Sequence, residues 1–245
     1  MKDIRFLEHP NLPSKKVVHT VVSGEYPQIL SALQKNGITP IRIEKCNSVI
    51  KPVTEHADMV FSYIGNGKYI CEKSQQKLRD ELDSYGFECQ GKVELLREYP
   101  HDILLNHVAI GKNLICKADY TPQAVKDCFK IIDVKQGYAK CSCAVVDENS
   151  IITDDESIFN TLSKLKFDVL LVRKGSVQLK GLNYGFIGGC CGKIAKDTLA
   201  FCGDLTTHSD FAQIKAFLNE RYVYPLSLIK GDLIDIGSII PVTEY

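Results

Sequence analysis

Two pairs of side chains that can perform acid–base and nucleophilic chemistry are spaced two positions apart in this sequence. His56 stands two positions before Asp58, and Cys141 stands two positions before Cys143. Residues i and i+2 of a β-strand project from the same face, so each pair would act together if its segment is extended. An imidazole can lower the pKa of a thiol and then donate a proton, and a carboxylate can orient the imidazole or hold a cationic substrate.

The ten cysteines could instead bind a metal or exchange disulfides. Besides Cys141 and Cys143, the chain contains the adjacent pair Cys190 and Cys191. Structural zinc sites prefer cysteines that are separated by two to four residues, whereas alternate and adjacent cysteines on strands are poor chelators. We therefore predict neither a metal nor a cofactor, and we keep zinc binding and thiol redox chemistry as the less favoured alternatives.

The overall composition is that of a globular protein and excludes several classes of partner. The 245 residues include 30 basic and 30 acidic side chains, so no net field attracts nucleic acid or an anionic membrane. No run approaches the roughly 18 apolar residues of a membrane span, and the N-terminal segment MKDIRFLEHPNLPSKK lacks the apolar core of a signal peptide. We expect a cytoplasmic protein with reduced thiols, without membrane contact and without a nucleic-acid partner.

The elements that must position the reactive side chains recur as a unit along the chain. An apolar stretch turns at a cluster of Gly, Asn or Asp and resumes, an amphipathic helical pattern follows, and a short apolar strand ends the unit. In the second unit, Thr121 and Pro122 have the chemistry of a helix N-cap and a first helical residue. Hairpins are expected at residues 59–73, 106–121, 143–155 and 185–204, and a fifth, N-terminal copy at residues 16–44.

This repeat favours a ring of units over a layered sheet. Five β-β-α-β units of about 40–50 residues each would bury their faces only against neighbours, as in arrays closed by rotation. The alternative is a doubly wound sheet, but that fold prefers single strands between helices, and the glycine-rich phosphate-binding signatures are absent. Because no linker divides the chain, we predict one domain over residues 1–245.

Three segments resemble those of a known enzyme superfamily. The segment HADMVF, residues 56–61, resembles the His-x-Asp strand of arginine deiminases and their relatives. Residues 106–115, NHVAIGKNLI, are similar to the Asn-x-x-x-x-Gly hairpin that follows in those enzymes, and residues 136–146, QGYAKCSCAVV, resemble the glycine-rich strand that carries their nucleophilic cysteine. The closest likeness is to an uncharacterised bacterial family assigned to the same fold. The resemblance implies an α/β fold of the pentein type, a five-bladed pseudo-fivefold propeller of ββαβ units.

The resemblance also implies roles for individual residues. Cys141 takes the position of the nucleophile and His56 that of the general acid/base, with Asp58 as a clamp or orienter and Asn106 as a substrate-binding residue. In the familiar enzymes the nucleophilic cysteine lies near the C-terminus, whereas about a hundred residues follow Cys141 in this chain. The resemblance therefore implies a circular rearrangement of the units. A rival match places Ser238 and Ile239 of the C-terminal segment GDLIDIGSIIPV where the cysteine would stand.

The sequence departs from the superfamily in its second carboxylate. Those enzymes carry Glu-Gly-Gly-Asp in the unit before the His unit, whereas this chain has FLEHPNLP, in which Glu8 is the candidate. The glycines of GFIGG surround Ile187 instead of an acid. We expect Gly188 and Gly189 to permit close backbone approach and to help bind the substrate.

The function implied is that of a thiol-dependent hydrolase or amidinotransferase acting on a small cationic guanidino or amidino compound, on a C–N bond other than a peptide bond. Paired carboxylates would hold the planar cation, and a Cys–His pair would attack it without a cofactor. The alternative is a non-catalytic pentein-fold protein that binds a partner. The presence of both His56 and Cys141 favours the enzyme.

Overall fold

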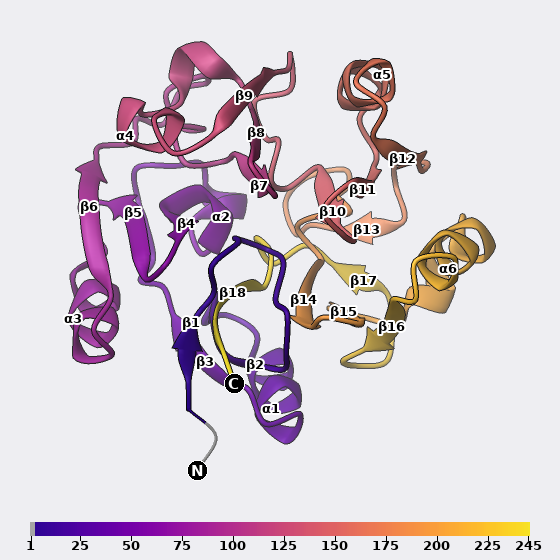
Figure 1. Cartoon of the computed structure of the whole chain (residues 1–245), viewed down its shortest axis with the longest axis horizontal. Helices are drawn as coiled ribbons and strands as arrows, with labels where there is room; N and C mark the ends of the chain where they lie inside the picture. Colours follow the sequence, from indigo (N-terminus) through magenta and orange to yellow (C-terminus); the bar gives the residue numbers. More distant parts are fainter. Residues whose placement is uncertain (1–2) are drawn as a thin grey trace.

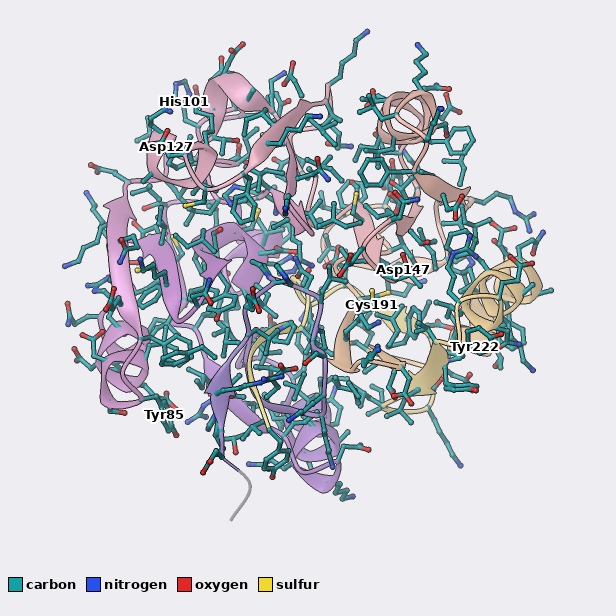
Figure 2. All side chains as sticks on the ribbon, in the orientation of Figure 1. Tyr85, His101, Asp127, Asp147, Cys191 and Tyr222 are labelled. Atoms are coloured by element: carbon teal, nitrogen blue, oxygen red, sulfur yellow. The ribbon has the colours of Figure 1, made fainter. Side chains whose placement is uncertain are left out.

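The structure is a computed structural model that describes residues 3–245 of the chain. It is a mixed α/β protein in which short sheets and helices succeed one another around the molecule (Figure 1). The side chains that point outward, such as Tyr222 with 79% of its surface exposed, lie at the periphery, whereas the buried Cys191 lies nearer the middle (Figure 2). Within the described residues, no helix is long and apolar enough to cross a membrane.

Most of the described chain repeats one unit: an antiparallel hairpin, a helix, and a strand parallel to the second hairpin strand. A hairpin needs only a tight turn, whereas a parallel strand needs a crossover, which the helix supplies. Four units lie within the chain. The first consists of β4 (Phe61–Gly65), β5 (Lys68–Glu72), α3 (Gln76–Ser84) and β6 (Glu88–Val93), and the second of β7 (Val108–Ile110), β8 (Asn113–Cys116), α4 (Gln123–Lys126) and β9 (Lys130–Asp133). The third consists of β10 (Cys143–Val145), β11 (Ser150–Thr153), α5 (Glu156–Lys164) and β12 (Asp168–Leu171), and the fourth of β14 (Cys191–Ala195), β15 (Thr198–Phe201), α6 (Phe211–Asn219) and β16 (Tyr224–Ser227). The hairpins predicted from the sequence are all confirmed.

A further unit is assembled from both ends of the chain. The N-terminal segment supplies β2 (Val17–Val22), α1 (Pro27–Lys35) and β3 (Thr39–Arg42), with β2 and β3 parallel. The antiparallel partner of β2 is β18 (Ile240–Glu244), which also pairs with β1 (Arg5–Phe6). The sequence indicated only the first three of these elements, because the strand that completes the hairpin lies more than two hundred residues away.

The start of α4 differs from the prediction. Pro122 occupies the N-cap position, and the hydroxyl of Thr121 donates to the carbonyl of Lys117 at 3.1 Å instead of capping the helix. By contrast, Asp155 caps α5 through its carboxylate, which accepts from the backbone N–H groups of Ser157 and Ile158. This is the usual way in which an acidic N-cap satisfies the free donors of a first turn.

The core lies between neighbouring sheets and between each sheet and its helix. Strand β2 is buried at all six positions, whereas the outer strand β6 alternates between exposed and half-buried residues. On α3, Leu78 and Leu82 are one helical turn apart and both fully buried. Strand β2 therefore faces the interior on both sides, whereas β6 borders the solvent.

The remaining elements are short and connect the units. Strands β13 (Val177–Gln178) and β17 (Leu233–Ile234) form a two-stranded parallel sheet. Three 3₁₀ helices and one α-helical turn complete the described secondary structure: η1 (Lys51–Val53), α2 (Ala57–Val60), η2 (Ala118–Tyr120) and η3 (Leu205–Thr207).

Candidate active site

His56 lies in the short connection between η1 and α2, in an extended conformation with φ −90° and ψ 119°. Its position is fixed from the far end of the chain, because Gly237 (φ +75°) lies so close that an added Cβ would collide with His56. The carbonyl of Gly237 also accepts from the N–H of Asp58 at 3.1 Å. The imidazole itself is only 2% exposed.

Asp58 belongs to the helical turn α2 and not to the strand that the sequence predicted. Positions i and i+2 of a helix point in different directions, so the shared strand face cannot account for the pairing of His56 with Asp58. The two side chains nevertheless meet because His56 precedes the helix and is extended. His56 and Asp58 are therefore close to each other, as expected, but an extended residue before a helical turn brings them together instead of a shared strand face.

Cys141 lies in a turn just before β10, where the sequence predicted a longer strand. Asn106 holds this turn from the preceding unit: its Oδ1 accepts from the N–H groups of Lys140 (2.9 Å) and Cys141 (3.2 Å). Its Nδ2 donates to the Cys141 sulfur at 3.0 Å. The carbonyl of Cys141 accepts from the N–H of Gly189 at 2.9 Å. The thiol is thus anchored from two other units.

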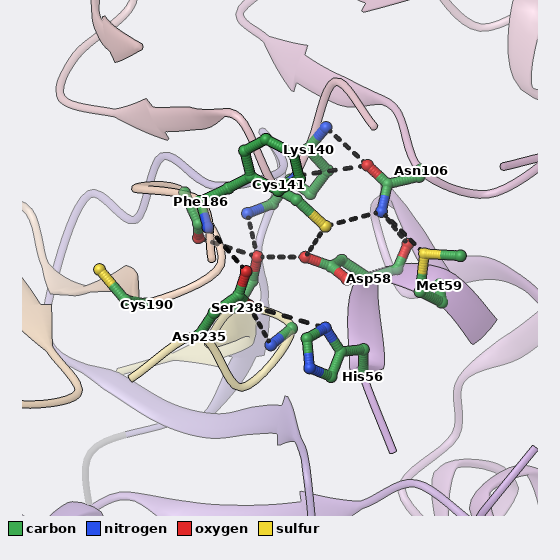
Figure 3. Close-up of polar contacts among 12 residues, drawn as sticks. His56, Asp58, Met59, Asn106, Lys140, Cys141, Phe186, Cys190, Asp235 and Ser238 are labelled. Atoms are coloured by element: carbon green, nitrogen blue, oxygen red, sulfur yellow. Dashed lines mark hydrogen bonds and ion pairs between the residues drawn. The ribbon is translucent and has the colours of Figure 1, made fainter. Parts of the chain in front are cut away.

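These elements bring a thiol, an imidazole and a carboxylate together (Figure 3). The Cys141 thiol donates to Asp58 Oδ2 at 3.1 Å. One ligand atom each from His56, Asp58 and Cys141 lies within 4.8 Å of the other two. Behind Asp58, Lys140 Nζ donates to Ser238 Oγ at 3.0 Å, and the Ser238 hydroxyl lies 2.8 Å from Asp58 Oδ2.

A second carboxylate, that of Asp235, was missed by the sequence analysis. Asp235 Oδ1 lies 3.6 Å from His56 Nδ1. Its Oδ2 accepts from the N–H of Phe186 at 2.9 Å, and its Oδ1 accepts from the N–H of Gly237 at 3.0 Å. The signal was present in GDLIDIGSIIPV, the segment already matched to a nucleophile strand, which contains two acids, Asp232 and Asp235.

Glycines allow the approach of Asp235 to the site. An added Cβ on Gly189 would collide with the carboxylate of Asp235. One on Gly188 would collide with the carbonyls of Lys140 and Cys143. The predicted close backbone approach is therefore present. The N–H of Gly189 is directed at the carbonyls of Cys141 and Phe186, so it is not free for a substrate.

The cluster forms the floor of an open cavity of about 280 Å³. Asp235, Cys141 and His56 line the cavity directly, while Asp58 lies behind the thiol. The walls are apolar and come from residues 50–59, from Tyr138 and from the segment 179–186. The volume lies just below the roughly 300–1,000 Å³ typical of small-molecule sites.

Burial dominates the ionisation of the cluster. It raises the pKa of the Cys141 thiol well above its usual value, and the charges of Asp58 and Asp235 raise it further. It also raises the pKa of Asp58, lowers that of His56, and raises that of Asp235 to about 6. With no cation bound, the site therefore favours a neutral thiol and a neutral imidazole.

Several polar atoms of the cluster have no hydrogen-bond partner among residues 3–245. They are both ring nitrogens of His56 and Oδ1 of Asp58. A buried donor or acceptor left unsatisfied costs about 1–3 kcal/mol, and most buried polar groups in native proteins are paired. His56 lines the cavity and Asp58 lies behind the thiol, so the unpaired atoms are at or next to the cavity.

The same three residues could also hold a metal ion. A thiolate, an imidazole and a carboxylate are a donor set that zinc accepts, and three protein ligands with one open position are typical of catalytic zinc. The sequence analysis considered only cysteine pairs as ligands. The Cys190 and Cys191 thiols instead lie 3.2 and 3.3 Å from the carbonyl of Ile187.

The other residues predicted to bind substrate lie elsewhere. Glu8 is exposed, with 76% of its side-chain surface accessible, and is not among the residues that line the cavity. Asn106 lies behind the thiol and contacts protein groups through both its amide atoms. Gly188 contributes its carbonyl, 3.0 Å from the Ser238 hydroxyl. The structure thus brings Asn106, Gly188 and Gly189 to the site as supporting residues and leaves Glu8 outside it.

Comparison with protein families decides the family of the chain. The model of a family described as "Family of unknown function (DUF6873)" matches residues 21–240. The chain belongs to this family. No curated protein matches the sequence of this DUF6873 member.

Solved structures share its fold at very low sequence identity. Inosamine-phosphate amidinotransferase StrB1 from Streptomyces griseus is similar with a TM-score of 0.59 and 9% identity, over 91% of this chain and 90% of that one. C. jejuni agmatine deiminase gives 0.55 and 11%, over 93% and 91%. DDAH from Pseudomonas aeruginosa, a mutant complexed with citrulline, gives 0.52 and 8%, over 87% and 93%. The DUF6873 chain therefore shares the mixed α/β fold of these pentein enzymes, although likeness of fold alone does not assign an activity.

Proposed function

We propose that this chain is a thiol-dependent enzyme that hydrolyses or transfers the amidino group of a small cationic guanidino or amidino compound. Cys141 is the nucleophile, His56 is the general acid/base, and Asp58 and Asp235 hold the cation and orient the imidazole. The reaction needs no cofactor. We further propose that the chain forms a single domain that closes as a five-bladed propeller. The order of its units is circularly rearranged relative to arginine deiminases and their relatives.

One observation carries the proposal: a thiol, an imidazole and a carboxylate within 4.8 Å of one another, beside an open cavity whose floor contains a second carboxylate. Two carboxylates with one thiol suit a substrate that is both a cation and an electrophile. Oxygen pairs make charge-assisted hydrogen bonds to the N–H groups of a planar guanidinium. The same pentein fold serves amidinotransferases and deiminases.

The raised pKa of Cys141 and the lowered pKa of His56 are consistent with activation by the substrate. A bound cation next to Asp58 and Asp235 offsets the negative charges that keep the thiol protonated. The thiol proton then passes to His56, and the sulfur attacks the amidinium carbon. His56 returns that proton to the departing amine, which leaves an amidino group on Cys141.

The second half-reaction restores the thiol. His56 removes a proton from water or from an acceptor amine, which attacks the amidino carbon and expels the Cys141 sulfur. Water gives net hydrolysis, and an amine gives net transfer. The proton taken by His56 returns to the sulfur, so the enzyme is unchanged at the end of the cycle.

A non-catalytic cation-binding protein is the second candidate, and one observation favours it. A neutral thiol that donates to Asp58 at 3.1 Å is not in itself an activated nucleophile. The two functions differ in whether a bound cation accelerates reactions at the sulfur.

The test is alkylation of the purified protein with 2-chloroacetamidine, a cation, and with neutral 2-chloroacetamide, in the presence of EDTA and with the modified cysteine located by mass spectrometry. The exposed Cys128 is the internal control for the intrinsic reactivity of each reagent. We expect Cys141 to prefer the amidine at least tenfold more than Cys128 does, and we expect His56→Ala to slow this labelling. Equal preference at both cysteines would contradict the proposal. An amidine that protects Cys141 without modifying it would favour the binding protein.

A further inference from the structure

The walls of the cavity differ in chemistry from its floor. Five aliphatic or thioether side chains and three aromatic ones line the cavity besides the cluster, and the polar groups among these wall residues are the Asn183 amide and the hydroxyls of Tyr138 and Tyr184. The wall residues are Ile50, Val53, Met59, Tyr138, Leu179, Leu182, Asn183, Tyr184 and Phe186. The residues that line the cavity within the described chain thus include no lysine or arginine.

This charge distribution excludes an anionic group on the part of the ligand that faces the walls. Cys141, His56 and Asp235 on the floor provide no permanent cation. The nearest buried ammonium, that of Lys140, donates to Ser238 and lies outside the lining. A carboxylate in this cavity would lose water and find no cationic side chain to pair with, at a large cost in free energy.

Three aromatic rings form one side of the wall and are held in place. Tyr138 and Phe186 are stacked with ring centroids 6.4 Å apart, and Tyr184 meets Phe186 edge-on at 6.1 Å. The Tyr138 hydroxyl donates to Asp102 at 2.6 Å, which fixes that ring. The backbone N–H of Phe186 donates to Asp235, so the aromatic wall and the acid of the floor are joined at a single residue.

The mouth of the cavity is apolar as well. Leu182 and Tyr184 are 49% and 36% exposed, which places apolar surface where a ligand would leave the cavity. This segment packs on the turn before α2, since a Cβ on Gly181 would lie 3.2 Å from Pro52 Cγ. The neighbouring Lys51 and Lys180 are exposed and do not line the cavity.

We propose that the substrate is a monocationic guanidine or amidine whose other substituent is uncharged and apolar, either a short alkyl chain or a single aromatic ring. The inference rests on the proposed function and narrows its substrate class. The cationic head contacts the acids of the floor, and the apolar substituent packs against the aromatic wall. Substrates that carry an α-amino acid head group are disfavoured.

The test measures binding separately from reaction. Isothermal titration of the Cys141→Ser variant compares phenylguanidine with 4-guanidinobenzoate, a pair that differs in one carboxylate, and butylguanidine with arginine. We expect phenylguanidine and butylguanidine to bind at least about tenfold more tightly than their carboxylate-bearing counterparts. Equal affinities would overturn the inference, because Lys51 or Lys180 would then have to reach the ligand.

A substitution at the mouth of the cavity provides a test that does not depend on the stability of the fold. Leu182→Lys places a cation where none lines the cavity, so it should improve the binding of 4-guanidinobenzoate relative to that of phenylguanidine several-fold. Leu165→Lys is the matched control, since Leu165 is similarly exposed (52%) and does not line the cavity. An equal gain in both variants, or none in Leu182→Lys, would overturn the inference.

The outcomes separate this inference from the function on which it rests. Suppose that the amidine labels Cys141 selectively but that arginine and butylguanidine bind with equal affinity. That result would overturn the inference of an apolar substituent and leave the proposed enzyme function intact. Tight binding of neutral benzamide, equal to that of benzamidine, would show that the acids do not select a cation. That result would overturn both.

Discussion

Replacing Asp58 with asparagine should change the two alkylation rates of Cys141 in opposite directions. Asp58→Asn removes a charge but keeps the size of the side chain and an oxygen that can accept from the Cys141 thiol and the Ser238 hydroxyl. The charge of Asp58 attracts a cationic reagent and, at the same time, raises the pKa of the thiol. Its loss should slow 2-chloroacetamidine and leave 2-chloroacetamide equally fast or faster.

The size of the effect follows from the geometry. Asp58 Oδ2 lies 3.1 Å from the sulfur, so an amidinium that reacts there lies about 4–5 Å from the carboxylate. At an effective dielectric constant of about 20, two unit charges at about 5 Å interact by roughly 3 kcal/mol. Desolvation of the cation and partial protonation of the buried acid cancel much of this. A net loss of about 1.4–2.7 kcal/mol corresponds to a rate about 10–100 times lower.

The assay follows both reagents at pH 7.5 by mass spectrometry of peptides that contain Cys141 and Cys128. The exposed Cys128 corrects for reagent concentration and intrinsic reactivity in each variant. If both rates at Cys141 fall together, Asp58 acts through the structure of the site, and the electrostatic account of substrate binding is wrong. If the ratio of the rates is unchanged, the cation does not contact Asp58.

Three other perturbations test parts of this account. Burial raises the pKa of Asp154 to about 7, so the folded state retains a proton that the unfolded chain loses near pH 4, and the free energy of unfolding falls as the pH rises between these values. Asp154→Asn should remove about 3 kcal/mol of that fall in urea titrations at pH 4.5 and pH 8, and parallel pH profiles would refute it. Ser238→Ala should lower the free energy of unfolding by about 1–3 kcal/mol because a buried ammonium loses its acceptor; unchanged urea midpoints would show that the ammonium finds another partner. Gly189→Ala should destabilise the fold and abolish the preference of Cys141 for the amidine, because the new Cβ displaces Asp235. The control Gly91→Ala, which has nothing within 4 Å of the new Cβ, should do neither. Equal effects in both variants would mean that Asp235 can move at little cost.

The repeating units could be predicted from the sequence because they depend on local patterns. Turn residues between two apolar stretches specify a hairpin, and one amphipathic helix specifies the parallel return. The strands β18 and β1 could not be predicted as partners of β2, since nothing local in Ile240–Glu244 distinguishes its partner. The helical turn at Ala57–Val60 was also missed, because four residues are too few to show a helical period.

The candidate site was predictable only where the motif fixed the residue. His56, Asp58 and Cys141 were selected by resemblance, and their side chains come together. Glu8 was selected because it was the only acid in the expected segment, but its side chain points to solvent although several of its neighbours in that segment are buried. The second carboxylate near His56 is that of Asp235, which comes from the other end of the chain and directly follows β17. Contacts between distant segments depend on the tertiary fold, which local patterns do not encode.

The surroundings of His56 favour catalysis over simple binding. A protein that only binds a cation needs the carboxylates of Asp58 and Asp235 and gains nothing from an imidazole buried beside a thiol. Nδ1 of His56 lies 3.6 Å from Asp235 Oδ1, and neither ring nitrogen has a hydrogen-bond partner in the described chain. A catalytic base is typically oriented by a third group on one side and exchanges its proton on the other. Asp235 can therefore orient the imidazole while Nε2 stays free to exchange a proton with the thiol or the substrate, an arrangement that suits an enzyme and has no evident purpose in a binding protein.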